Sequence, residues 1–274
     1  GDGFDDILIG ASGADPNGDN SGESYVVFGK ENGFENSLNL SSLDGSTGFV
    51  INGIDVEDTS GFSVSSAGDM NGDGFDDILI GAYRADPNGD ESGESYVVFG
   101  KENGFEDSLD LSSLDGNTGF VINGIEFGDR SGRSVSSAGD INGDGFDDIL
   151  IGAPWADPNG HFSGESYVVF GKENGFDDSL DLSSLDGSTG FVINGIDAKD
   201  YSGFSVSSAG DINGDGFDDI LIGAPWADPN GHFSGESYVV FGKENGFDDS
   251  LDLSSLDGST GFVINGIDVE DTSG

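Results

Sequence analysis

The sequence is one pattern written four times. The string Gly-Asp-Gly-Phe-Asp-Asp-Ile-Leu-Ile-Gly begins at residues 1, 72, 143 and 214, which sets a repeat of 71 residues. Self-similarity at a fixed period is typical of architectures in which each unit packs only against its neighbours. The chain therefore divides into units 1–71, 72–142, 143–213 and 214–274, the last of them incomplete, and we expect a single array over residues 1–274.

Four short apolar runs recur once per repeat, and one set of them covers residues 62–67, 78–82, 96–99 and 120–122. They are rich in Val, Ile, Phe and Tyr and bounded by Gly, Asn, Asp and Ser, a pattern that indicates strands. Four antiparallel strands repeated radially form the blade of a β-propeller. The sequence thus predicts an all-β array of four blades with fifteen strands, because the first blade lacks its innermost strand.

Residues 101–119 are the least regular part of the unit. Their leucines, Leu109, Leu111 and Leu114, are compatible with a short strand or with a helical turn. We interpret the segment as a connection that these leucines pack against the blade. Whether four blades close a ring or form an arc of a larger one stays open.

The composition excludes several classes of partner. Asp and Glu number 54 and Lys and Arg only 8, so the net charge is −46, which opposes binding to nucleic acid or to an anionic membrane. No run approaches 18 apolar residues, so no membrane insertion is expected. The chain starts Gly-Asp-Gly without Met, and we interpret it as an excised piece whose missing targeting signals carry no weight. A folded protein this acidic either lives in high salt or recruits divalent metal.

One acidic loop recurs between the first and second strands. Its first complete copy reads Asp-Met-Asn-Gly-Asp-Gly-Phe-Asp-Asp over residues 69–77, with side-chain oxygens at positions 1, 3, 5 and 9. That spacing wraps a chain around a hard cation, with a glycine at the sharp turn and a Phe carbonyl as a further donor. An EF-hand would need a bidentate Glu at position 12, where this loop has Ile80 inside a strand.

These motifs resemble the FG-GAP repeat of integrin α-subunits. The resemblance rests on Phe204-Ser205-Val206, on the loop 211–219, on Gly223-Ala224-Pro225 and on Gly235-Glu236-Ser237-Tyr238-Val239, in family order. It implies a calcium-binding propeller. In integrins the propeller ring has seven blades. The calcium ligands it implies are Asp69, Asn71, Asp73, Phe75 and Asp77; Asp140, Asn142, Asp144, Phe146 and Asp148; and Asp211, Asn213, Asp215, Phe217 and Asp219. The first unit keeps only Asp2, Phe4 and Asp6, so we expect that site to be weak or empty.

The four units differ mainly in two loops, one after the second strand and one after the fourth. The candidate ligand-binding residues in the first of these loops are Trp155, His161, Phe162, Trp226, His232 and Phe233. The resemblance places both loops on one rim, opposite the calcium loops, where integrin propellers meet ligands. There the aromatic rings offer apolar faces to a sugar or a protein side chain. The competing interpretation is that the Trp pair caps neighbouring blades and that the histidines are ordinary loop residues.

The resemblance implies a calcium-stabilised, secreted or cell-surface propeller for recognition or adhesion of protein or glycan ligands, and not an enzyme. The alternatives are a non-catalytic structural or accessory portion of a larger secreted enzyme, since FG-GAP repeats accompany a phospholipase, and a plain spacer. The missing innermost strand also leaves an unpaired edge, from which we expect self-association.

Overall fold

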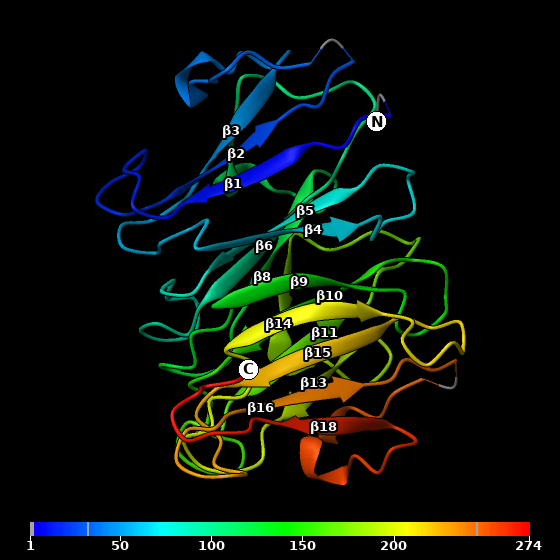
Figure 1. Cartoon of the computed structure of the whole chain (residues 1–274). Coiled ribbons are helices and arrows are strands. Elements are labelled where there is room, and N and C mark those ends of the chain that lie inside the picture. The colour runs from blue at the N-terminus through cyan, green and yellow to red at the C-terminus, as the bar shows by residue number, and fades with distance from the viewer. Residues whose placement is uncertain (1–2, 32, 245) are drawn as a thin grey trace.

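The computed structural model describes residues 3–31, 33–244 and 246–274 (Figure 1). Within them the fold is all-β, and the elements form four sheets that follow one another along the chain. The first blade holds β1 (Ile7–Ala11), β2 (Glu23–Val27) and β3 (Gly48–Asn52), and the second β4 (Ser63–Gly68), β5 (Asp77–Ala82), β6 (Glu94–Val98) and β8 (Gly119–Asn123). The third holds β9 (Ser134–Gly139), β10 (Asp148–Ala153), β11 (Glu165–Val169) and β13 (Gly190–Asn194), and the fourth β14 (Ser205–Gly210), β15 (Asp219–Ala224), β16 (Glu236–Val240) and β18 (Gly261–Asn265).

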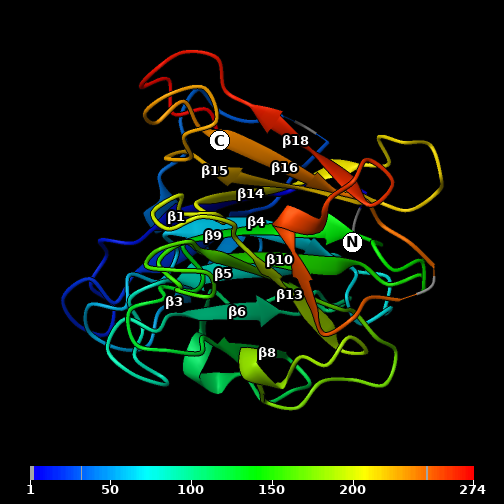
Figure 2. The ribbon, with the colours of Figure 1, turned by 90° about the horizontal axis from the view of Figure 1, so that it is seen from below.

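These sheets are the predicted propeller blades. Consecutive strands pair antiparallel, as Leu79 with Val97 and Val97 with Phe120. The first blade lacks an innermost strand, as expected. In the complete blades that strand ends in a register shift, for example between Ser66 and Gly68, just before the acidic loop. The innermost strands β4, β9 and β14 lie side by side (Figure 2), and the Val135 N–H donates to Ser63 Oγ at 3.0 Å.

The segment predicted as a plain connection contains both a strand and a helical turn. In the second unit it forms β7 (Ser108–Asp110) and the 3-10 turn η2 (Leu111–Ser113). The later units repeat this with β12 (Ser179–Asp181), η3 (Leu182–Ser184), β17 (Ser250–Asp252) and η4 (Leu253–Ser255), and the first unit has η1 (Leu40–Ser42) alone. Each of the three short strands pairs in parallel with the fourth strand of the preceding blade. The described residues therefore contain eighteen strands rather than fifteen.

The hydrophobic core lies between the blades. Three clusters of buried residues each combine the fourth strand of one blade with the second and third strands of the next. Across the first interface, for example, Phe49 and Ile51 meet Ile80 and Tyr96, all with no exposed surface. No described strand of the first blade pairs with one of the fourth, and Figure 1 shows these blades at opposite ends of the array.

Candidate functional site

The acidic loops close on their own backbone. Asp69 accepts hydrogen bonds from the N–H groups of Asp73 at 3.0 Å and Gly74 at 2.9 Å, and Asn71 Oδ1 accepts from the Asp73 N–H at 2.8 Å. The acidic loops of the third and fourth blades repeat this arrangement around Asp140 and Asp211. The loop thus turns oxygen side chains at positions 1 and 3 inward, as a cation loop requires.

The carboxylate at position 9 is anchored inside the blade. Asp77 accepts from the Met70 N–H at 3.1 Å and from the Gly100 N–H at 2.9 Å. Burial raises the pKa of Asp77 to about 7, against the opposing effect of those hydrogen bonds, and the carboxylates of Asp73 and Asp69 raise it further. In the third unit burial raises the pKa of the equivalent Asp148 to about 8. These carboxylates are costly to keep charged in the absence of a cation.

The donor chemistry of the acidic loops fits a hard cation. Each complete loop carries three carboxylates, at positions 1, 5 and 9, and an amide within nine residues, and the ion pairs found among the described residues all lie elsewhere. The same residues contain no group of three or more Asp, Glu, His or Cys side chains already arranged to hold a metal ion. The loops therefore supply the oxygens, and a bound ion would have to draw them together. In the first unit Asp6 accepts from the Gly29 N–H at 2.8 Å, and Asp2 lies outside the described residues.

The two variable loops meet on the opposite rim. The loop between the second and third strands is hydrogen bonded to the loop that leads into the next blade, as in the bond from the Arg130 N–H to the Glu91 carbonyl at 3.0 Å and from the Tyr201 N–H to the Phe162 carbonyl at 3.0 Å. All four of these residues have left-handed backbone, with φ between 53° and 59°. Non-glycine residues adopt that conformation at an energetic cost, and such residues concentrate at functional sites.

Most of the candidate aromatic residues belong to one cluster on this rim. Trp155 and Trp226 lie 6.0 Å and 4.7 Å from the ring of Tyr201, and Phe162 lies 5.3 Å from it. Both tryptophans are half-buried, so they contact neighbouring blades and still present surface. Phe233 stacks on His232, as Phe162 does on His161, each at 3.7 Å. The histidines are exposed.

A central arginine completes the cluster and was missed by sequence reasoning. The guanidinium of Arg133 lies between the rings of Phe62 at 4.3 Å and Phe204 at 4.7 Å. Burial lowers the pKa of Arg133 from its usual high value. The available signal was that residues 62, 133 and 204 occupy the same place in the repeat and that only the middle one is not Phe. We call Phe62, Tyr83, Arg130, Arg133, Trp155, Phe162, Tyr201, Phe204 and Trp226 the aromatic cluster.

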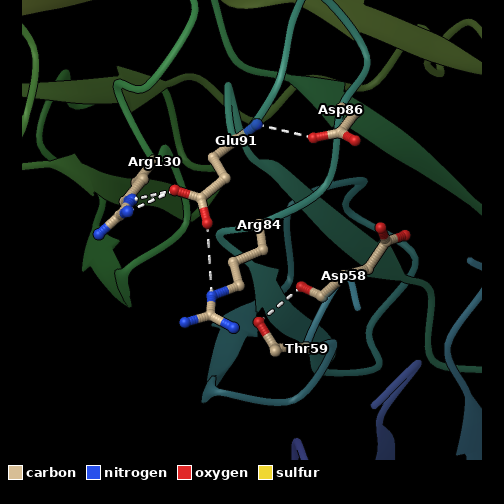
Figure 3. Close-up of polar contacts among 6 residues, drawn as sticks. All are labelled: Asp58, Thr59, Arg84, Asp86, Glu91 and Arg130. Carbon is tan, nitrogen blue, oxygen red and sulfur yellow. Dashed lines mark hydrogen bonds and ion pairs between the residues drawn. The ribbon is translucent and has the colours of Figure 1, made fainter. Parts of the chain in front are cut away.

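Ion pairing continues the cluster toward the second blade. Glu91 lies between two guanidinium groups, pairing with Arg130 and, at 3.6 Å, with Arg84 (Figure 3). The backbone N–H of Glu91 donates to Asp86 at 2.6 Å, which closes the loop. Arg130 also lies 4.6 Å over the ring of Trp155. Salt bridges and aromatic contacts thus join the variable loops of the second, third and fourth blades.

Comparison with known proteins identifies the repeat. The FG-GAP repeat model matches residues 60–98, 131–169 and 202–240. The chain is 28% identical over 262 residues to integrin alpha-PS2 of Drosophila melanogaster, covering 94% of this chain and 17% of that protein. It is 31% identical over 169 residues to integrin alpha-5 of Xenopus laevis, covering 60% and 14%.

A third relative has a different kind of name. The chain is 30% identical over 188 residues to phosphatidylinositol-glycan-specific phospholipase D of Bos taurus, covering 65% of this chain and 21% of that protein. The chain thus spans about a fifth or less of the length of these three relatives. Among the described residues no helix has the length and apolar character needed to cross a bilayer.

Proposed function

We propose that this chain, which carries three FG-GAP repeats, is a calcium-stabilised propeller array that recognises a protein or glycan ligand outside the cell. The observation that carries the proposal is the gathering of the variable positions on one rim. There they build one aromatic cluster on left-handed backbone, while the repeated acidic loops occupy the opposite rim. Uniform loops favour a structural role, and variable loops on a rigid scaffold favour recognition.

Calcium would be held in the three complete acidic loops. In the loop of residues 140–148 the ligands would be the side chains of Asp140, Asn142, Asp144 and Asp148 and the carbonyl of Phe146. The loops 69–77 and 211–219 offer the equivalent residues. Such all-oxygen shells rigidify a turn. We therefore assign calcium to stabilisation of the blades and not to chemistry on a substrate.

The aromatic cluster has the composition of a recognition surface. Tryptophan and tyrosine rings bury large apolar area at low entropic cost and stack against sugar rings or side chains. Trp155, Trp226 and Tyr201 present half-exposed rings on one surface. Arg130 stacks on the ring of Trp155, and Arg133 lies between the rings of Phe62 and Phe204, so the surface also carries two guanidinium groups. A ligand that combines a planar apolar face with acceptor oxygens suits this surface.

The relatives support an adhesive setting. Several are named integrin alpha subunits, and we extend their extracellular, non-catalytic character to this chain as part of the proposal. The phospholipase relative favours one alternative, in which the array is a non-catalytic accessory portion of a larger secreted enzyme. The recognition proposal and this alternative predict the same blade structure. They differ in whether a catalytic domain belongs to the same protein.

The test is binding to glycan arrays and to immobilised extracellular proteins in millimolar calcium, with the parent chain, Trp155→Ala/Trp226→Ala and the matched control Phe127→Ala. Phe127 is 71% exposed on the same rim and outside the cluster. We expect the double variant to lose binding and the control to keep it, with similar melting temperatures for all three. Unchanged binding by the double variant would refute the assignment of the rim. A large fall in its melting temperature would show that the Trp pair is core.

A further inference from the structure

The positive side chains are few and are divided between the two rims. Four of the five lysines lie over phenylalanine rings at equivalent places in the repeat, and one of them, Lys172, donates its backbone N–H to the Met70 carbonyl in an acidic loop at 2.8 Å. All three arginines, Arg84, Arg130 and Arg133, lie on the opposite rim, in the aromatic cluster or beside it. A chain of net charge −46 thus gathers its guanidinium groups around one set of aromatic rings.

Arg133 has no anionic partner among the described residues. Arg130 is paired with Glu91 (Figure 3), whereas the side chain of Arg133 makes neither an ion pair nor a hydrogen bond to any of those residues. Its guanidinium lies between the rings of Phe62 and Phe204, at 4.3 Å and 4.7 Å. Burial, with a smaller contribution from the charge of Arg130, lowers the pKa of Arg133. A partly buried cation without a partner is costly, and a carboxylate placed against its N–H groups offsets that cost.

The repeat does not provide that carboxylate. The equivalents of Arg133 are Phe62 in the second blade and Phe204 in the fourth, so no copy of this place in the repeat carries an acid. The third blade has both of its neighbours in this array, and each contributes a ring to the guanidinium. The nearest surroundings of Arg133 therefore do not depend on the number of blades. The anion that suits Arg133 is expected from a ligand.

The rings beside Arg133 offer one stacking surface. Phe204 packs edge-to-face with Trp226 at 4.9 Å, and both rings are half-buried. On the other side of the guanidinium, the ring of Tyr83 already lies under Arg84 at 5.4 Å. A ligand that stacks on Phe204 and Trp226 therefore reaches Arg133 from the side on which ring surface remains exposed.

A hexuronate combines the two groups that this surface suits. Its pyranose ring has an apolar face that stacks on aromatic side chains, and its carboxylate is attached directly to a ring carbon. A sugar ring over Phe204 and Trp226 brings that carboxylate within reach of Arg133, whose guanidinium lies 4.7 Å from the same Phe204 ring. Neutral sugars lack the anion, and aspartate or glutamate side chains lack the ring.

We propose that this surface binds an acidic sugar, with the ring of a hexuronate on Phe204 and Trp226 and its carboxylate paired with Arg133. The inference rests on the proposed function, because it names the ligand class of the same aromatic cluster. A guanidinium suits this role because its planar fork pairs with both oxygens of a carboxylate. The net charge of −46 repels any anion at long range. At physiological salt that repulsion is screened beyond about 8 Å, whereas a partly buried contact pair is screened much less.

The test compares the acidic and neutral forms of one sugar chain. Tetrasaccharides of galacturonate and of mannuronate, each beside the same chain with its carboxylates reduced to primary alcohols, are titrated calorimetrically into the protein in millimolar calcium at physiological salt. An Asp-rich peptide serves as another source of carboxylates. We expect the parent to bind the acidic form of at least one chain about tenfold or more tightly than the reduced form, the effect of one charge-assisted hydrogen bond.

Two variants with the same change of net charge separate contact pairing from long-range attraction. Arg133→Phe introduces the residue that the repeat has at 62 and 204, and Lys172→Gln removes a positive charge from the rim of the acidic loops. We expect Arg133→Phe to bind the acidic and reduced forms with equal affinity and Lys172→Gln to keep the preference of the parent. Far-ultraviolet circular dichroism verifies that each variant is folded. If Arg133→Phe is not, Arg133→Gln replaces it and is judged by the same outcomes.

Several outcomes would overturn the inference. Equal affinity of the parent for the acidic and reduced forms would exclude an acidic sugar and leave the proposed function standing, because the rim would still bind a glycan. Binding of the peptide alone would exclude the sugar class. A preference that Arg133→Phe retains, or that Lys172→Gln loses, would exclude Arg133 as the pairing group. If none of these probes binds, the inference fails, and the arrays described above decide the proposed function separately.

Discussion

Replacing Phe176 with Ala should weaken the packing between the second and third blades. The ring of Phe176 stacks on Phe120 at 4.3 Å and 5° and lies 5.7 Å from Phe99, so it joins a segment of the third unit to the blade before it. A fully buried Phe→Ala change costs about 3–5 kcal/mol, and a stacked aromatic pair adds about 0.5–1.5 kcal/mol beyond buried area. Because Phe176 is only partly buried, we expect a loss of about 2–3 kcal/mol.

The chain carries its own control at the same place in the repeat. Phe34 follows the same Glu-Asn-Gly sequence, is 53% exposed and stacks on no other aromatic ring among the described residues. Each ring also lies under a lysine, with Lys172 at 4.6 Å from Phe176 and Lys30 at 4.9 Å from Phe34. The loss of this cation–π contact is therefore common to the two variants and cancels when their stabilities are compared. Phe34→Ala should therefore cost less than about 1 kcal/mol.

The assay is thermal and urea unfolding in calcium, followed by Trp155 and Trp226 fluorescence, at concentrations low enough to avoid association. The two variants should differ by about 2 kcal/mol, or about 4–8 °C in melting temperature. Equal losses of stability in both would refute the claim that the Phe stack beside the short parallel strand holds successive blades together.

Two further predictions follow from the interior. Gly152→Ala should destabilise the folded state by about 1–3 kcal/mol in the same melting assay, because an added Cβ would lie 2.0 Å from the Gly203 carbonyl oxygen. A loss of stability smaller than that of Phe34→Ala would count against this close approach of the two backbones. Burial, reinforced by the nearby carboxylates of Glu165 and Glu126, raises the pKa of Asp129 to about 7. Between about pH 4 and pH 7 the carboxyl group is therefore protonated more fully in the folded state than in the unfolded state. Its contribution to stability is therefore present at the acidic end of that window and is lost as the pH rises through 7. Asp129→Asn should raise the melting temperature at pH 8 and reduce its rise on acidification, and identical pH profiles for parent and variant would exclude this carboxylate as the cause.

The blades could be predicted from the sequence because each strand is a local signal. Runs such as Ile-Leu-Ile-Gly are bounded by turn residues and repeat at a fixed distance, so both their type and their order were evident. The short parallel strands such as β7 could not be predicted in the same way. Ser108–Asp110 has only three residues, and its partner strand lies in the preceding unit, as in the bond from Asn52 Nδ2 to Asp110 Oδ1 across 58 residues. A pairing that short is set by its neighbours and not by its own pattern.

The candidate sites also combine features that the local sequence predicts with features that depend on contacts between distant residues. The acidic loops were recognisable because all their oxygens lie within nine residues, and the structure shows the inward turns that this spacing indicates. The rim loops were located by comparing the four units. What joins their rings is Tyr201, which contacts both Trp155 and Trp226 and has left-handed backbone at φ 55°. No local sequence pattern announces that conformation in a tyrosine.

The role of calcium is tested most directly by melting the parent chain in chelator, in magnesium and in millimolar calcium at constant ionic strength, beside Asp144→Ala and Asp215→Ala. Three loops each carry three candidate ligand carboxylates within nine residues in a chain of net charge −46, so a cation that draws them together should stabilise the folded state. A site at a hundred times its Kd contributes about 2.7 kcal/mol. We predict a saturable rise in melting temperature with calcium, smaller in each variant and not reproduced by sodium. A melting temperature that is the same in chelator and in calcium would contradict the assignment of these loops as calcium sites.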